Sequence, residues 1–110
     1  MNAKPTADTL LARLSTWFQR HCNDDWEHEH GITIKTCDNP GWIVRVDLQK
    51  TPLVDKPFTP VLDGVDDEGW QLDDESPWLH CMVDEGAFQG AGDPTRLEEI
   101  LEIFLAWADA

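Results

Sequence analysis

Residues 24–48 read DDWEHEHGITIKTCDNPGWIVRVDL, and this stretch decides how the chain folds. Apolar and polar side chains alternate from residue 32 to 36 and again from 42 to 48. Alternation with a period of two, in segments rich in β-branched residues, is typical of half-buried strands. Asn39-Pro40-Gly41 separates the two runs, and proline followed by glycine favours a type II turn. The stretch therefore predicts a β-hairpin in which Gly41 supplies the positive φ of the turn.

Two amphipathic helices are expected, one near each end of the chain. The first is predicted to start near Thr6–Asp8, after a frayed tail at residues 1–5, and to end near Cys22–Asn23. The second is predicted to start at Asp93 as the N-cap and Pro94 as the first helical residue. Apolar residues and one histidine recur at helical spacing in both segments: Leu10, Leu11, Leu14, Trp17, Phe18 and His21 in the first, and Leu97, Ile100, Leu101, Phe104, Leu105 and Ala108 in the second.

Further short strands are expected between the first hairpin and the last helix. Pro57–Leu62 can form a strand only where prolines are tolerated, at a sheet edge, a strand start or a bulge. In Trp78–Asp84, alternate residues are expected to face the core, which leaves Trp78, His80 and Met82 on the opposite face. A turn at Asp84-Glu85-Gly86 is expected to lead into a return strand at Ala87–Gln89. Gly90–Gly92 then reads as a flexible lead into the last helix.

This order of elements indicates the α+β class. Helix, hairpin, short strand, acidic loop, hairpin and helix follow one another within a single domain that spans residues 1–110. Because the connections are short, four or five strands are expected to form one antiparallel meander. Both helices are expected to pack on one face of this sheet, which leaves the other face open for binding.

The chain is strongly acidic. Among 110 residues, 22 Asp and Glu outnumber 8 Lys and Arg, which gives a net charge of −14. Such a field repels nucleic acids and anionic membranes and favours a basic protein partner. The sequence contains neither an apolar run of about 18 residues, as a membrane span requires, nor a signal peptide. Three cysteines without CxxC spacing indicate free thiols and a cytoplasmic location.

Acidic residues concentrate in a predicted loop at residues 63–76. No Lys or Arg occurs between Lys56 and Arg96, so like charges repel along this segment and oppose ordered structure. Two interpretations remain open: a solvated loop with Trp70 folded back onto the domain, or an acidic finger with Trp70 as a hydrophobic anchor. The residues expected to bind a partner are Asp66, Asp67, Glu68, Trp70, Asp73, Asp74, Glu75 and Trp78, with Asp24, Asp25 and Glu27 as a second group.

Histidines near the first hairpin raise the alternative of a metal-binding protein or a hydrolase. His21, His28 and His30 lie close together in the sequence, but their spacing lacks the CxxC or HExxH pattern of zinc sites. Cys81 is expected inside the core, and the acids that follow it disfavour a thiolate nucleophile. We therefore predict no catalytic residue, cofactor or metal, and the His21/His28/His30 cluster remains the alternative.

Uncommon tryptophan and turn motifs occur from Trp17 to Trp107 and become sparse between Gln49 and Ser76. They are Asp24-Asp25-Trp26-Glu27-His28, Gly31–Ile34, Asp38–Trp42, Trp78, Cys81, Phe88, Gly90–Pro94 and Leu97–Leu101. In this order they resemble the immunity protein 53 family of bacterial polymorphic toxin systems. The resemblance implies a non-catalytic protein that binds and neutralises a cognate toxin. The protein itself is expected to be a monomer or a homodimer. A dimeric housekeeping interaction module is the remaining alternative.

Overall fold

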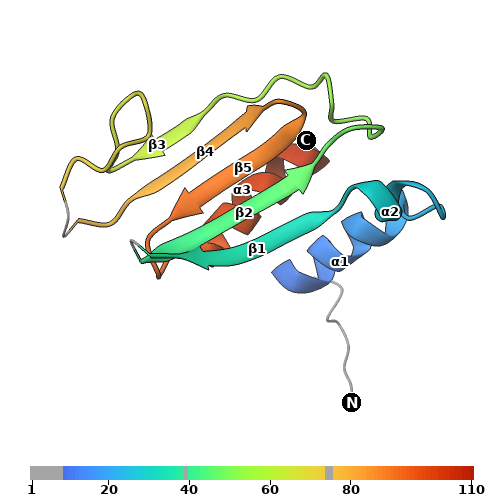
Figure 1. Cartoon of the computed structure of the whole chain (residues 1–110), viewed down its shortest axis with the longest axis horizontal. Coiled ribbons are helices and arrows are strands. Elements are labelled where there is room, and N and C mark those ends of the chain that lie inside the picture. Colours follow the sequence, from blue (N-terminus) through green and yellow to red (C-terminus); the bar gives the residue numbers. More distant parts are fainter. Residues whose placement is uncertain (1–8, 39, 74–75) are drawn as a thin grey trace, which may run out of the picture.

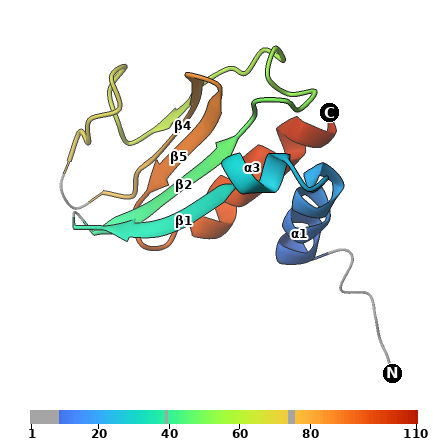
Figure 2. The same cartoon turned by 45° about the vertical axis from the view of Figure 1, so that its right-hand side comes forward.

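The computed structural model describes residues 9–38, 40–73 and 76–110. The elements in chain order are α1 (Leu10–His21), α2 (Trp26–Glu29), β1 (Ile32–Cys37), β2 (Gly41–Asp47), β3 (Val61–Asp63), β4 (Leu79–Asp84), β5 (Ala87–Gly92) and α3 (Leu97–Asp109). The five strands form one antiparallel sheet, and α1 and α3 lie on the same face of it (Figure 1, Figure 2). The structure thus confirms the α+β class with the two terminal helices on one face.

The strand order differs from the expected meander. Across the sheet it is β1-β2-β5-β4-β3, so β5 lies between β2 and β4. The connection after β2 carries the chain across the sheet to β3 at the far edge, and β4 and β5 then return toward the centre. The edge position of β3 confirms the expectation for the proline-rich segment before it, because a proline cannot donate a ladder hydrogen bond.

Gly90 and Gly92 belong to the central strand β5, and the prediction of a flexible lead into the last helix is wrong. A Cβ atom on Gly90 would lie 2.5 Å from Cγ2 of Ile100 in α3. A Cβ atom on Gly92 would lie 2.8 Å from Cβ of Arg96. Glycine is therefore required at these positions because α3 lies directly against the strand, and not because the backbone needs to be flexible.

Gly41 also has a role different from the predicted one. It is the first residue of β2, and its φ lies outside the positive range that a type II turn requires at the third position. A Cβ atom here would lie 2.5 Å from the carbonyl oxygen of Gly92 on the neighbouring strand. The hairpin itself is confirmed, with Ile32 opposite Val46 and Cys37 opposite Gly41. Asn39, in the predicted turn, lies outside the described residues.

Both main helices begin later than predicted. Thr9 is the N-cap of α1, and its Oγ1 accepts a hydrogen bond from the Ala12 N–H at 3.1 Å. Asp93 closes a turn before α3, in which its carbonyl oxygen accepts from the Arg96 N–H at 3.0 Å, so Pro94 is not helical. The predicted tail at residues 1–5 and the start at Thr6–Asp8 fall outside the described residues. No helix in the described part of the chain is long and apolar enough to cross a membrane.

The core lies between the sheet and the two main helices. The predicted apolar stripe of α3 is confirmed, since Ile100, Leu101, Phe104 and Leu105 are all buried. The segment expected to be a polar loop contains the single turn α2, which buries Trp26 next to α1. The Trp26 indole N–H donates to the Gln49 carbonyl oxygen at 2.9 Å, so this residue anchors the segment as predicted.

Candidate partner-binding surface

The acidic segment after β3 is more ordered than its composition predicts. Residues 64–72, which we call the acidic turn, are held by a β-bridge between Val65 and Gln71. The Leu72 N–H donates to the Gly64 carbonyl oxygen at 3.1 Å and closes the base of this turn. Gly64 and Gly69 have φ values of 70° and 89°, which glycine adopts without strain. The predicted acidic loop therefore contains a β-bridge and backbone hydrogen bonds of its own.

Asp66 organises the acidic turn. One oxygen of its carboxylate, Oδ1, accepts hydrogen bonds from the backbone N–H groups of Glu68 at 2.9 Å and Trp70 at 3.0 Å. Its carbonyl oxygen accepts a third hydrogen bond, from the Gly69 N–H at 2.9 Å. The side chains of Asp66, Asp67 and Glu68 are all exposed. Of these three acids predicted to bind a partner, Asp66 holds the turn through its carboxylate.

The remaining acids of this segment lie between the turn and β4. Asp73 is exposed, and its Oδ2 accepts a hydrogen bond from the Ser76 hydroxyl at 3.2 Å. Asp74 and Glu75, which were also predicted to bind a partner, lie outside the described residues. The structure therefore locates four of the six predicted acids of the segment, namely Asp66, Asp67, Glu68 and Asp73.

Trp70 is the main apolar group of the turn, and it is not folded back into the core. Its exposed fraction is 69%, and that of Leu72 is 70%. Two large apolar side chains held in solvent by an ordered turn are typical of a binding surface. Trp70 is therefore not buried in the core, and its role as a hydrophobic anchor stays a prediction.

The open face of the sheet contributes a hollow next to this turn. Ala91 on β5 is the cross-strand neighbour of Ile43 on β2 and of His80 on β4, so the three side chains share one face. A hollow of about 550 Å³ lies over them. Its lining residues are Cys37, Ile43, Gly69, Trp70, Gln71, Trp78, His80 and Ala91. A second hollow of about 140 Å³ shares Ile43, His80 and Ala91 and extends over Met82 and Gln89.

Trp78 belongs to this hollow in a way that the sequence did not indicate. It was expected to be exposed on the open face, together with His80 and Met82, but only 7% of its surface is exposed. A Cβ atom on Gly41 would lie 3.3 Å from Cζ2 of the Trp78 ring, so the missing side chain of Gly41 makes room for the indole. The expectation of exposure is therefore wrong, and Trp78 forms part of the wall of the hollow instead of a protruding anchor.

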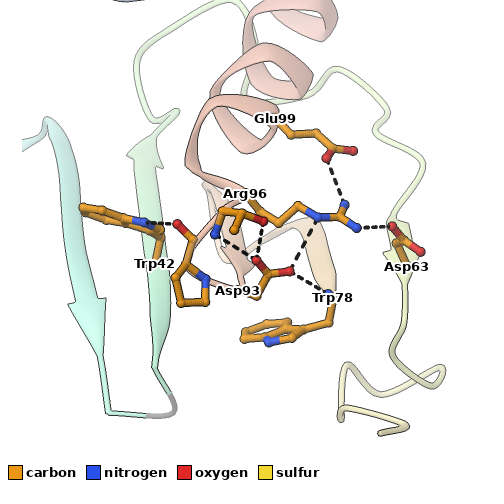
Figure 3. Close-up of polar contacts among 8 residues, drawn as sticks. Trp42, Asp63, Trp78, Asp93, Arg96 and Glu99 are labelled. Carbon is orange, nitrogen blue, oxygen red and sulfur yellow. Dashed lines mark hydrogen bonds and ion pairs between the residues drawn. The ribbon is translucent and has the colours of Figure 1, made fainter. Parts of the chain in front are cut away.

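A network of ion pairs fixes the base of the acidic segment (Figure 3). Arg96 lies 2.9 Å from Asp63 at the end of β3, 2.9 Å from Glu99 on α3 and 3.5 Å from Asp93. Asp93 in turn accepts a hydrogen bond from the Trp78 N–H at 2.9 Å. Residues on both sides of the acidic segment, Asp63 and Trp78, are thus attached to the start of α3. Sequence reasoning missed this network because Asp63 and Trp78 are distant in the chain from Arg96 and Asp93.

The network also shifts the pKa values of Asp93 and Arg96. Burial alone would raise the pKa of Asp93, but hydrogen bonds from Thr95 and Trp78, together with the Arg96 guanidinium, hold this pKa below its ordinary value. The hydrogen bond to Asp63 is the main cause that raises the pKa of Arg96. The network therefore keeps opposite charges side by side at the foot of the proposed binding surface.

The second predicted acidic group lies at the other end of the molecule, beside α2 (Figure 1). Glu27 accepts hydrogen bonds from the backbone N–H groups of Asn23 and Asp24, both at 2.8 Å. Backbone hydrogen bonds of this kind lower the pKa of Glu27. Asp25 lies 3.6 Å from the Lys50 ammonium group. The structure therefore does not bring this group together with the acidic turn. Glu27 holds the backbone of its own turn, and Asp25 pairs with Lys50.

His21 and His30 of the alternative metal site both lie against the Trp26 ring but have different polar partners. His21 Nδ1 lies 2.8 Å from the Trp17 carbonyl oxygen, and His30 Nδ1 lies 3.8 Å from Asp47 Oδ2. His28 is exposed on α2. Within residues 9–38, 40–73 and 76–110, no three His, Cys, Asp or Glu side chains are arranged to hold a metal ion. The structure therefore gives the metal-binding alternative no support.

Cys81 is confirmed as a core residue. Its side chain is buried between the sheet and α3, and burial, with a smaller contribution from Glu99, raises the pKa of its thiol to about 12. A thiol with such a pKa is protonated at neutral pH and is a poor nucleophile.

Comparison with known protein families identifies a match over most of the chain. The family model described as immunity protein 53 matches residues 11–109, which is nearly the whole chain. No curated protein and no solved structure matches the chain.

Proposed function

The chain belongs to the immunity protein 53 family, and on this premise we propose that it binds and neutralises a cognate bacterial toxin. The match over residues 11–109 is the observation that carries the proposal. In this proposal the protein acts by occupying a surface of the toxin and performs no chemistry of its own. It acts in the cytoplasm, where the free thiols of Cys22, Cys37 and Cys81 remain reduced.

The toxin is proposed to be basic and to dock on the acidic turn and the adjoining hollow. A net charge of −14 attracts a basic protein over a distance and speeds its association. The exposed Trp70 and Leu72 then supply apolar contacts, which mainly slow dissociation. A stable interface of ordinary size buries about 800 Å² on each partner, so it would extend from the acidic turn onto the open sheet face.

Co-expression with the neighbouring gene tests this proposal. The tagged protein is produced together with the product of the gene next to its own, and the complex is purified at increasing salt. We expect the neighbouring product to be toxic alone, harmless in the pair, and bound in a salt-sensitive complex. Absence of both protection and a stable complex would contradict the proposed function.

A further inference from the structure

We propose that the hollow on the open sheet face receives one arginine side chain of the toxin, which stacks against Trp70. This inference rests on the proposed function, because the arginine belongs to the toxin. It specifies which chemical group of the toxin the surface binds.

The shape of the hollow suits a long, flat side chain. Its floor contains the small residue Ala91, flanked on the neighbouring strands by Ile43 and His80. The aromatic rings of Trp70, in the acidic turn, and Trp78, just before β4, form part of the walls of the hollow. The volume of about 550 Å³ falls within the range of roughly 300–1,000 Å³ that is common for ligand pockets. The hollow can therefore accommodate an arginine side chain and some water.

The position of Gly69 keeps the acidic turn close to the sheet. A Cβ atom on this residue would lie 2.7 Å from Nδ1 of His80, and its φ of 89° is one that other residues rarely adopt. The turn therefore rests on the His80 ring at Gly69. Trp70, the next residue, lines the hollow while 69% of its surface remains exposed. This leaves indole surface accessible for stacking with a ligand.

The distribution of charge favours a cation in this hollow. None of the described residues that line it is Asp, Glu, Lys or Arg, so the walls alone do not select a charge. The preference for a positively charged group comes from Asp67 and Glu68, which are exposed and directly precede Gly69 in the chain. Two bases share the open face with the hollow: Lys35, opposite Ile43 on β1, and Arg45, two residues after Ile43 on β2. Both would repel a cation, so the positive group of the ligand is expected on the side of Asp67 and Glu68. An anionic side chain would be repelled by these acids.

Arginine fits this combination better than lysine. A guanidinium group is planar, stacks on an indole and donates hydrogen bonds to carboxylates in the same plane. A lysine ammonium group is more strongly hydrated and cannot stack in this way. An aliphatic side chain would contact the apolar floor but would gain nothing from Asp67 and Glu68. The inferred occupant is therefore an arginine.

The first experiment measures binding of small probes without the toxin. N-acetyl-arginine methylamide is titrated into the protein while NMR follows the indole N–H signals of Trp70 and Trp78. We expect both signals to shift, with about two- to fivefold weaker binding of the lysine analogue and still weaker binding of the norleucine analogue. Equal shifts with the arginine and norleucine probes, or no shift with arginine, would overturn the inference.

Two variants connect the probe to the toxin. Ala91→Phe fills the hollow from its floor, and Thr33→Phe places the same side chain on the open face at the edge strand β1, where Thr33 is exposed. We expect Ala91→Phe to abolish the probe-induced shift of Trp78 and to weaken toxin binding at least about tenfold, since hot-spot contacts lie in well-packed pockets. Thr33→Phe is expected to change neither. Trp70→Ala provides a second test on an exposed side chain, should Ala91→Phe fold poorly.

Protection assays with the wild-type protein and the two variants test the arginine site and the immunity function independently. If the wild-type protein protects cells and Ala91→Phe and Trp70→Ala protect equally well at limiting expression, the arginine site is wrong and the immunity function stands. If the wild-type protein gives no protection, the proposed function fails whatever the probe shows.

Discussion

Single carboxylates within the acidic turn have two different tasks. Asp66 accepts three hydrogen bonds from the backbone of its own turn, two of them through its side chain. Asp67 and Glu68, its neighbours, are exposed. Sequence composition counts these three residues equally, and all three are exposed. Asp66 differs from the other two because its carboxylate accepts hydrogen bonds from the backbone of the turn. A substitution series on this surface therefore has to treat Asp66 separately.

Asp66→Ala is expected to loosen the acidic turn. Its carboxylate supports the N–H groups of Glu68 and Trp70, and hydrogen bonds to a charged group stabilise by about 1.5–3 kcal/mol. We expect hydrogen exchange at the Trp70 amide to become about tenfold faster or more, while core amides keep their protection. Asp67→Ala is the matched control and should leave this amide unchanged. Equal exchange rates in the two variants would show that Asp66 does not hold the turn.

Asp93 is expected to make stability depend on pH in the acid range. The pKa of this carboxyl lies below its ordinary value of 3.8 in the folded protein, so the unfolded chain binds its proton first as the pH falls. Asp93 therefore stabilises the fold above the unfolded pKa, and this contribution is lost as the pH falls through the folded pKa. Asp93→Asn should be less stable at neutral pH and approach the wild type below about pH 3.

Urea unfolding at several pH values measures this effect. The matched control is Asp109→Asn, near the exposed C-terminal end of α3, whose partner Arg13 lies 3.2 Å away. We expect the control to follow the wild-type curve closely, since exposed ion pairs contribute little. A constant difference between Asp93→Asn and the wild type at every pH would contradict the role of the Asp93 charge.

Among the secondary-structure elements, those with a clear apolar periodicity could be predicted from the sequence. The contacts that require glycine at particular positions could not. The β1–β2 hairpin and the buried stripe of α3 follow from alternation and helical spacing, and both are confirmed. Gly41 and Gly90 were read as turn and linker residues, because local rules associate glycine with turns. Their actual constraint is close contact with Gly92 and Ile100, which no local pattern reveals.

Gly90→Ala is expected to destabilise the fold by overpacking the contact between β5 and α3. The new Cβ atom would lie 2.5 Å from Cγ2 of Ile100, so the helix or the strand has to shift. Such changes cost about 1–3 kcal/mol of unfolding free energy, measurable by urea denaturation. Ile100→Ala removes Cγ2, and the double variant should lose less than the sum of the single losses. Additive losses would show that the two side chains do not compete for this space.

The sequence indicated candidate residues for the binding surface but not how the fold groups them. Asp67, Glu68 and Trp70 were predicted and lie on one ordered turn, whereas Asp25 and Glu27 lie at the opposite end of the fold. Ile43, Gln71 and Ala91 were missed, although alternation from Val44 already placed Ile43 on the open face. The hollow arises only when the turn lies against the sheet, and this depends on contacts between distant segments.

The placement of charge gives the last prediction, which compares two variants of equal net charge. Asp67→Asn with Glu68→Gln removes two charges from the acidic turn. Glu98→Gln with Glu102→Gln removes two from the exposed side of α3, which packs on the other face of the sheet. If the toxin docks on the acidic turn, local charge matters more than total charge. The turn variant should then associate with the toxin about three- to tenfold more slowly at low salt, and the helix variant at nearly the wild-type rate.

Stopped-flow association at two salt concentrations distinguishes these outcomes. The salt dependence should weaken for the turn variant, because fewer charge pairs remain to be screened within the Debye length of about 8–10 Å. Dissociation should change less than association, since exposed rim charges act mainly on the encounter. Equal slowing of both variants would mean that only the net charge of −14 steers the toxin. The docking surface would then have to be sought away from the acidic turn.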